Sequence, residues 1–154
     1  MDKQKVLDRM RKLCSAREYC VSDIRKKILA VADEGVDAGG IIDSLIKEKY
    51  LDEYRYARAF VNDKAILQGW GENKIRYALK AKKVENEAIS SALSGLDSDA
   101  ALDKMSSVLS NKYKALKGTE EEKFAKLYRF AVGRGYSYDN IKKVYDNIRS
   151  TKRD

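Results

Sequence analysis

The sequence contains no histidine and no proline, and it has only two cysteines, Cys14 and Cys20. Without histidine the chain lacks the commonest general base and the usual member of a catalytic triad. Zinc sites commonly use four ligands at tighter spacings, so two cysteines six residues apart do not form a metal-binding pattern. We therefore expect both cysteines to be ordinary thiols, and we predict neither a metal site nor a cofactor.

Several other sequence features that would indicate a particular function are also missing. No glycine-rich motif for binding a nucleotide follows a strand pattern, and the carboxylates are scattered beside lysines on helix faces. No apolar run approaches the roughly 20 residues that cross a bilayer. The N-terminal segment MDKQKVLDRMRKLC is too charged for a signal peptide. The sequence predicts a cytoplasmic protein that is not an enzyme and does not enter a membrane.

The absence of proline and the scarcity of β-branched runs favour an all-α protein, and the 44% of hydrophobic residues suffice for a core. Apolar residues recur at helical spacing along most of the chain. Residues suited to capping helix starts are Ser22, Asp52, Asn73, Thr119 (with Glu122 in a capping box) and Ser137. The helices are expected at about 2–18, 22–35, 38–48, 52–68, 74–82, 86–94, 98–118, 119–135 and 137–150.

These helices form a repeat with a period of about 50 residues, which is typical of a tandem helical array. Three positions superimpose, each followed five residues later by isoleucine: Val36, Val84 and Tyr136, with Ile41, Ile89 and Ile141. The repeats are predicted at 1–50, 51–97 and 98–150, with a frayed tail at 151–154. Stacked three-helix units usually form an elongated, curved array. We expect a radius of gyration above the ~15 Å of a compact chain of this length.

Basic side chains recur on aligned helices of the three repeats, in a chain with a net charge of +8. The run at 74–83, KIRYALKAKK, contains no acid. A repeated basic face fits a repeating anionic partner such as a polynucleotide backbone or a protein filament. Alternatively, these side chains only solvate the outer helix faces. The candidate binding residues are Arg25, Lys26, Lys27, Lys74, Arg76, Lys80, Lys82, Lys83, Lys126, Arg129, Arg134, Lys142 and Lys143.

The aromatic residues have two interpretations. Tyrosine can stack on bases of a single strand, but most of the ten tyrosines fall on apolar stripes, which favours packing in the core. Trp70, the only tryptophan, lies between Gly69 and Gly71. We interpret it as a wedge between the first two repeats rather than as a platform for a ligand.

Four segments make the chain resemble the RecX family of RecA regulators. They are AREYCVSDIRKKI (16–28), KEKYLDEYRYARAFVNDK (47–64), GWGENKIRYAL (69–79) and RGYSYDNIKKVY (134–145). The resemblance spans about residues 8–148, although the usual GYLDD-x-RFA reads KYLDEYRYA here and 95–118 carries no recognised motif.

The resemblance implies three tandem three-helix repeats and a monomer that binds RecA filaments on single-stranded DNA. It further implies a role in DNA repair, recombination and the SOS response. There the protein would restrain strand exchange, ATP hydrolysis and co-protease activity, with weaker direct binding of DNA. The family supplies no catalytic residues to carry over. The competing hypothesis is a basic helical protein that binds DNA without sequence preference and acts without RecA.

Overall fold

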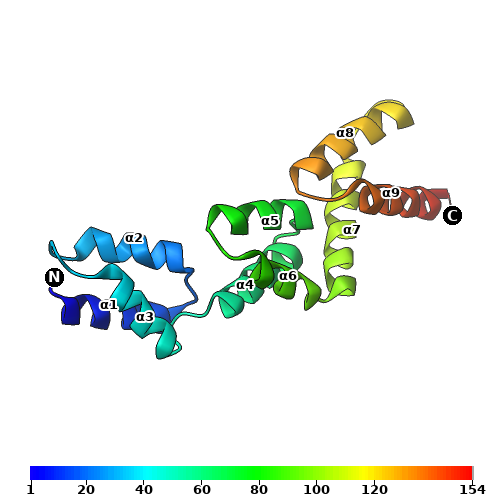
Figure 1. The fold of residues 1–154 in the computed structure, drawn as a ribbon. Coiled ribbons are helices and arrows are strands. Elements are labelled where there is room, and N and C mark those ends of the chain that lie inside the picture. Colours follow the sequence, from blue (N-terminus) through cyan, green and yellow to red (C-terminus); the bar gives the residue numbers. More distant parts are fainter. Residues whose placement is uncertain (154) are drawn as a thin grey trace. The chain divides into compact units, whose positions relative to one another are not determined.

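The computed structural model describes residues 1–153, with side chains as far as Thr151. All secondary structure in these residues is helical, which confirms the all-α prediction (Figure 1). The elements are α1 (Lys3–Ala16), α2 (Val21–Val31), α3 (Ala38–Lys47), α4 (Glu53–Asn62), the π-helical segment η1 (Asp63–Leu67), α5 (Glu72–Ala81), α6 (Asn86–Ser94), α7 (Ser98–Lys114), α8 (Glu120–Gly133) and α9 (Tyr138–Arg153).

Three of the predicted helix caps are confirmed. Side-chain oxygens of Asp52 and Thr119 accept hydrogen bonds from backbone N–H groups three residues later, at 3.1 and 3.2 Å. Ser137 Oγ accepts one from the Asn140 N–H at 3.3 Å. Each bond satisfies a backbone donor in the first turn that has no partner within its helix.

Two predicted caps are wrong because the helices begin earlier than their polar residues suggest. Cys20 occupies the N-cap of α2, so Ser22 lies inside that helix and its hydroxyl is used in a tertiary contact. Asn73 lies within α5, and its N–H donates to the carbonyl of Gly135 at 3.1 Å. In both cases a tertiary hydrogen bond takes the place of the expected local cap.

The helix ends also differ from the prediction: α2 ends at Val31 rather than near Gly35, and α7 ends at Lys114 rather than near Gly118. The helix expected at 52–68 changes to π-helical hydrogen bonding at η1. The last helix, α9, continues to Arg153, so the tail predicted to fray at 151–154 is helical as far as the structure describes it. Asp154 lies outside the described residues.

The backbone contacts divide the chain into two compact units. The first comprises Met1–Ala59 and Leu79–Ala92; the second comprises Phe60–Ala78 and the residues from Leu93 onward. The middle repeat therefore contributes to both units. The repeat boundaries after residues 50 and 97 and the curved, elongated shape stay predictions.

The core of the first unit lies among α1, α2 and α3. Met10, Ile24, Ile28, Ile41 and Leu45 are each 0% exposed there, as the helical periodicity predicted. Cys14 is buried in the same core as a free thiol, and burial raises the pKa of that thiol. A free thiol in this position behaves as a small apolar side chain.

A carboxylate also joins α4 to the start of α2 within the first unit. Glu53 Oε1 accepts a hydrogen bond from the Val21 N–H at 2.8 Å. The second oxygen of Glu53 is buried and has no hydrogen-bond partner in the part of the chain described. Burial favours the neutral acid and raises the pKa of Glu53.

The core of the second unit lies among α7, α8 and α9, where Leu109, Leu127, Ala131 and Ile141 are 0% exposed. At the start of α8, Glu120 accepts hydrogen bonds from the hydroxyls of Tyr113 at 2.8 Å and Tyr145 at 3.1 Å. Both hydroxyls therefore stabilise the ionised carboxylate and hold the first turn of α8 against the other two helices.

Two glycines bring separate segments of the second unit into backbone contact. The Gly71 N–H donates to the Arg134 carbonyl at 2.7 Å. A Cβ atom added to Gly71 would lie 2.2 Å from the carbonyl carbon of Gly135. Only a glycine therefore fits at position 71, and this close approach fixes the segment around Trp70 against the loop before α9.

Candidate binding surfaces

The first unit holds a basic cluster around Asp23 on α2. Lys82, just after α5, places its ammonium nitrogen 2.9 Å from Asp23 Oδ2, and its carbonyl accepts a 2.7 Å hydrogen bond from the Ser22 hydroxyl. The hydrogen bond with Asp23 raises the pKa of Lys82. Burial opposes ionisation of Asp23, but Lys82 outweighs burial and lowers the pKa of that carboxyl.

The next turn of α2 continues this basic cluster. Lys26 and Lys27 follow Asp23 by three and four residues, so they lie on the same side of the helix. The ammonium of Lys27 lies 5.6 Å from the ring centroid of Tyr19, and the guanidinium of Arg17 lies 4.5 Å from it. Arg17 was not among the predicted residues, because it lies between two helices and outside any basic run.

Other cations of the first unit carry charge that the described residues do not pair. The side chains of Arg25, Lys26, Lys80 and Lys83 are exposed, and they make no hydrogen bond or ion pair within residues 1–151. Arg25 and Lys26 follow Asp23 on α2, and Lys80 and Lys83 lie on either side of Lys82 in the chain. The structure therefore brings six of the predicted residues into one unit and leaves four of them open to a partner.

In the second unit, two lysines lie against Trp70. The Lys74 ammonium lies 4.3 Å and the Lys64 ammonium 4.7 Å from the ring centroid. Phe60 meets the same ring edge to face, with centroids 6.3 Å apart. These contacts place Trp70 among residues of its own unit, and its role as a wedge between the first two repeats stays a prediction. Lys64 was not among the predicted binding residues because it does not lie on one of the basic helices that align between the repeats.

Arg134 and Arg76 are both engaged within the second unit. Arg134 Nε donates to the Gly69 carbonyl at 3.2 Å, and its Nη2 donates to the Gln68 carbonyl. Arg76 forms an ion pair with Glu72 at 3.0 Å, one helical turn earlier. The guanidinium of Arg134 thus holds the loop before Trp70, whereas the exposed Arg76 pair is easily exchanged for a partner.

The remaining predicted cations lie on α8 and α9. The Lys126 ammonium donates to the Lys117 carbonyl at 3.3 Å, and that of Lys142 lies 2.9 Å from Asp146. Arg129 and Lys143 are exposed and make no ion pair with any described side chain. The structure therefore divides the predicted set into residues that stabilise the fold and residues that carry free charge.

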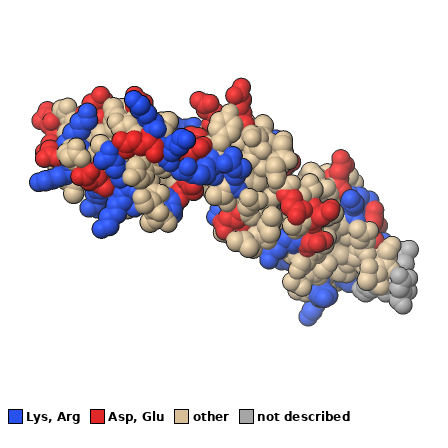
Figure 2. Space-filling model, turned by 90° about the horizontal axis from the view of Figure 1, so that it is seen from below, with Lys and Arg blue, Asp and Glu red and all other residues tan. Residues whose placement is uncertain are grey.

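Acidic side chains lie among the basic ones on the surface (Figure 2). The run at 74–83 contains no acid in the sequence. In the folded protein, however, Glu72 pairs with Arg76 and Asp23 pairs with Lys82. Within each unit, acidic side chains therefore interrupt the basic surface.

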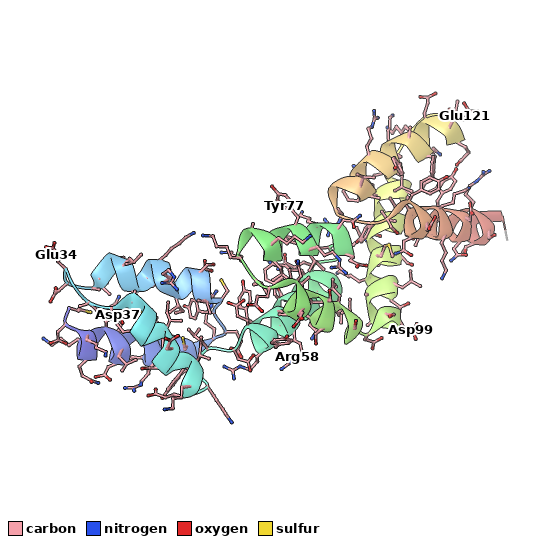
Figure 3. The ribbon with its side chains drawn as sticks, in the orientation of Figure 1. Glu34, Asp37, Arg58, Tyr77, Asp99 and Glu121 are labelled. Atoms are coloured by element: carbon pink, nitrogen blue, oxygen red, sulfur yellow. The ribbon has the colours of Figure 1, made fainter. Side chains whose placement is uncertain are left out.

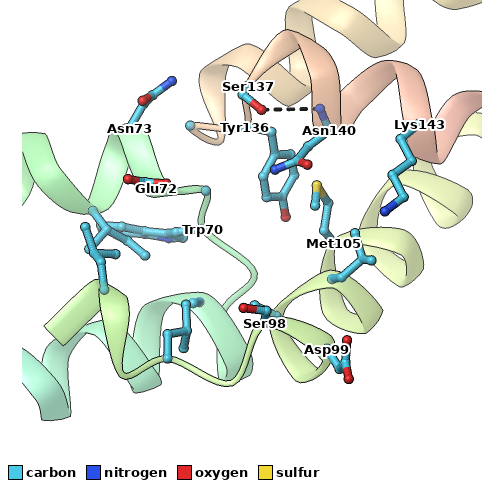
Figure 4. A pocket seen from close by; sticks show the side chains of 18 residues that line it. Trp70, Glu72, Asn73, Ser98, Asp99, Met105, Tyr136, Ser137, Asn140 and Lys143 are labelled. Carbon is cyan, nitrogen blue, oxygen red and sulfur yellow. Dashed lines mark hydrogen bonds between the residues drawn. The ribbon is translucent and has the colours of Figure 1, made fainter. Parts of the chain in front are cut away.

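A cavity of about 430 Å³ lies beside Trp70 in the second unit (Figure 4). Its apolar wall includes Met105 of α7, and its polar rim includes Glu72, Asp99 and Lys143. The rim carries both signs of charge. The cavity is thus better suited to an amino-acid side chain than to a phosphate group.

The tyrosines divide between core and surface. Tyr56, Tyr113, Tyr136 and Tyr145 are buried, which confirms their packing role. Tyr77 projects away from α5 and is 77% exposed (Figure 3). An exposed tyrosine three residues from Lys80 has the mixed apolar and polar character common at interfaces.

Two kinds of site are not seen in the described part of the chain. None of its helices is long and apolar enough to cross a membrane. Its cysteine and carboxylate side chains form no group placed to hold a metal ion.

The elements and surfaces above define an all-helical protein built from tandem three-helix domains with charged outer faces. Family models for the second and third three-helix domains of RecX match residues 52–93 and 99–145. The chain belongs to the RecX family.

Named relatives extend the match over most of the chain. It is 35% identical to the regulatory protein RecX of Clostridium botulinum (strain Alaska E43 / Type E3), across 93% of this chain and 73% of the relative. It is 31% identical to the regulatory protein RecX of Vibrio parahaemolyticus serotype O3:K6 (strain RIMD 2210633), across 84% of this chain and 82% of the relative.

Solved structures agree with the fold. The crystal structure of RecX from Lactobacillus salivarius superimposes with a TM-score of 0.78 at 19% identity, covering 95% of this chain and 96% of that one. A second crystal structure, of a regulatory protein RecX, gives a TM-score of 0.81 over 94% of this chain and 71% of the other. These likenesses support the tandem three-helix architecture.

Proposed function

We propose that this protein is a non-enzymatic, monomeric, cytoplasmic regulator that binds RecA filaments on single-stranded DNA. It restrains strand exchange, ATP hydrolysis and co-protease activity, and so acts in recombination, DNA repair and the SOS response. The observation that carries this proposal is the 35% identity, across 93% of the chain, to a protein named as the regulatory protein RecX.

The distribution of free charge supports an anionic partner. Arg25, Lys26, Lys80 and Lys83 present unpaired cations from one unit, and Arg129 and Lys143 do so from the other. A filament on DNA offers phosphates and carboxylates in a regular series, and cations that have no internal partner meet them at least cost. We propose these six residues as the primary contacts.

The engaged cations have a different proposed role. Lys82 and Arg134 make tertiary contacts that organise the elements carrying the free charges. Arg76, Lys142, Lys126, Lys74 and Lys27 make exposed or aromatic contacts that a partner can replace. We propose them as secondary contacts.

The test is RecA ATPase activity on single-stranded DNA at increasing ratios of this protein. Inhibition at far fewer molecules than RecA subunits is expected, because one regulator bound to a filament affects many subunits. A titration without inhibition at any ratio would rule the proposal out.

A basic helical protein that binds DNA alone is the competing function, and the free cations are compatible with it. Phosphate-dominated binding to a bare strand weakens steeply with salt, with a log–log slope near −0.7 per contact. We expect weak binding to the bare strand and tighter binding to the RecA-coated strand. Equal affinities for the two would favour the DNA-binding alternative.

A further inference from the structure

A groove of about 670 Å³ runs between α7 and α9 in the second unit. Ser106, Ser110 and Lys114 line it from α7 at intervals of four residues. Val144, Ile148 and Thr151 line it from α9 at intervals of four and three. Side chains at these spacings share one face of a helix, so the groove has two continuous walls.

The length of the groove fits a short helix. Eight residues separate Ser106 from Lys114, which is about 12 Å along α7, or two turns. The two serines are small, so a third element can approach α7 closely. An amphipathic helix that anchors residues at i, i+3 or i+4, and i+7 matches these dimensions.

The lining determines the chemistry of the occupant. Leu116 and Ile148, both partly exposed, give the groove an aliphatic character, whereas Val144 belongs to the core at 1% exposed. The charged side chains on the described lining are Lys114 and Lys123, both cationic, and no carboxylate lies among the lining residues. Lys123 already pairs with Glu120 at 3.9 Å, whereas the exposed Lys114 makes no ion pair with a described residue. The groove therefore favours aliphatic side chains flanked by acidic ones.

Nucleic acid fits this groove less well. Base recognition on a single strand relies on exposed aromatic faces. Tyr113, the aromatic residue on the lining, is 5% exposed, and the Lys123 ammonium lies 5.4 Å from its ring centroid. The aliphatic side chains of Leu116 and Ile148 offer a base no stacking partner, although they pack well against leucine or isoleucine.

We propose that the groove between α7 and α9 is a docking site for an acidic amphipathic helix of a partner protein. The apolar face of that helix packs on Leu116 and Ile148, and its carboxylates meet Lys114. None of the lining residues is among the free cations assigned above to the filament, so the inference goes beyond the proposed function.

The probe is a fluorescein-labelled helical peptide of about 14 residues, which is roughly four helical turns. It carries leucines at i, i+3, i+4 and i+7 and glutamates on both flanks. A second peptide with lysines in place of the glutamates is the control for charge. Fluorescence anisotropy with the intact protein measures affinity, and amide NMR shifts locate the bound peptide.

Two variants test the groove itself. Lys114→Glu changes an exposed side chain that makes no ion pair within the described residues, and it should weaken binding of the acidic peptide about five- to tenfold. Ser110→Tyr fills the groove without changing net charge and should abolish measurable binding. Lys5→Glu makes the same charge change at an exposed site on α1, in the other unit and outside the groove lining, and should alter affinity by less than about twofold.

Each outcome decides the proposal. Shifts at the amides around Ser106, Ser110 and Ile148, together with loss of affinity in Lys114→Glu, support it even if Ser110→Tyr fails to fold. Absence of peptide binding, or equal binding of acidic and basic peptides, overturns it. Groove shifts caused by single-stranded DNA would assign the groove to nucleic acid, and shifts caused by dilution alone would assign it to a second copy. Because RecA is absent from these measurements, their failure is distinguishable from failure of the proposed function.

Discussion

The ammonium nitrogen of Lys82 lies 2.9 Å from Oδ2 of Asp23, a residue 59 positions earlier in the chain. This pair joins the end of α5 to the start of α2, and the hydrogen bond from the Ser22 hydroxyl to the Lys82 carbonyl runs beside it. A lysine that the sequence placed on a binding surface therefore also stabilises the first unit.

Lys82→Ala should lower the free energy of unfolding by about 0.5–1 kcal/mol, because the pair is partly exposed and solvent screens it. Lys80→Ala is the matched control, since the Lys80 side chain is exposed and unpaired among the described residues, and it should change little. Urea denaturation at neutral pH measures both. Equal stability of the two variants would show that the Lys82–Asp23 pair does not stabilise the fold.

Arg134→Ala should destabilise the protein by roughly 1.5–3 kcal/mol, because the carbonyls of Gln68 and Gly69 lose a charged donor. Arg129 lies on α8, the helix that Arg134 follows as its C-cap, but is exposed and unpaired within the described residues, so Arg129→Ala should leave the melting temperature unchanged. Thermal melts followed by circular dichroism compare them. A stable Arg134→Ala variant would place Arg134 with the binding residues instead.

Gly71→Ala should destabilise the protein by about 3 kcal/mol or more, because the added Cβ would lie 2.2 Å from the Gly135 carbonyl carbon and neither backbone has room to move. Gly133→Ala is its control: a Cβ there meets no atom within 4 Å, and alanine favours the helix by up to about 1 kcal/mol. Unfolding in urea should show opposite signs for the two changes. A mild effect of Gly71→Ala would mean that the two loops can separate.

Glu120 should make stability depend on pH in the acid range. Hydrogen bonding to Tyr113 lowers the pKa of Glu120, aided by Tyr145 and nearby cations and opposed by partial burial. A lowered carboxyl pKa stabilises the fold above the unfolded-state pKa, and this contribution disappears as pH falls through the lower folded-state value.

The variant Glu120→Gln should therefore melt below the wild type at pH 7 and approach it as pH falls through the lowered folded-state pKa of Glu120, where the carboxylate becomes protonated. The measurement is a series of thermal melts across this range. Tyr145→Phe, which removes one of the two hydroxyl donors, should show a smaller change in the same direction. A difference that is constant with pH would exclude the charge of Glu120 as its cause.

The double variant Arg76→Ala with Lys80→Ala should weaken RecA inhibition strongly and leave the helical circular dichroism nearly unchanged. Each lost charge-assisted contact with the filament should cost roughly 1.5–3 kcal/mol, whereas the exposed Arg76–Glu72 pair contributes only about 0.3–0.5 kcal/mol to folding. Charge reversal at Lys142 and Lys143 should act in the same direction, more weakly.

Arg58→Ala is the control for this variant, because Arg58 is an exposed arginine on α4 outside the proposed contacts (Figure 3). RecA ATPase inhibition measures all three. Full inhibition by the Arg76/Lys80 variant would mean that the basic helix is only a solvated face, and the filament contacts would then lie on the acidic or aromatic faces.

The sequence alone determined the helical class, the positions of most helices and the family. These depend on local information: helical spacing of apolar residues selected Ile24, Ile28 and Ile41 for the core, and all three are buried. The caps at Asp52 and Thr119 were predictable for the same reason, because a cap bonds to a backbone group only three residues away.

The tertiary structure alone decided which cations are free. Charge on a helix can be counted from the sequence, but Asp23 neutralises Lys82 across 59 residues and the Gly69 carbonyl engages Arg134 across 65. The same holds for the groove between α7 and α9, whose walls come from residues about 40 positions apart in the chain. Pairing, burial and grooves depend on distances through space, and periodicity along one helix contains no information about them.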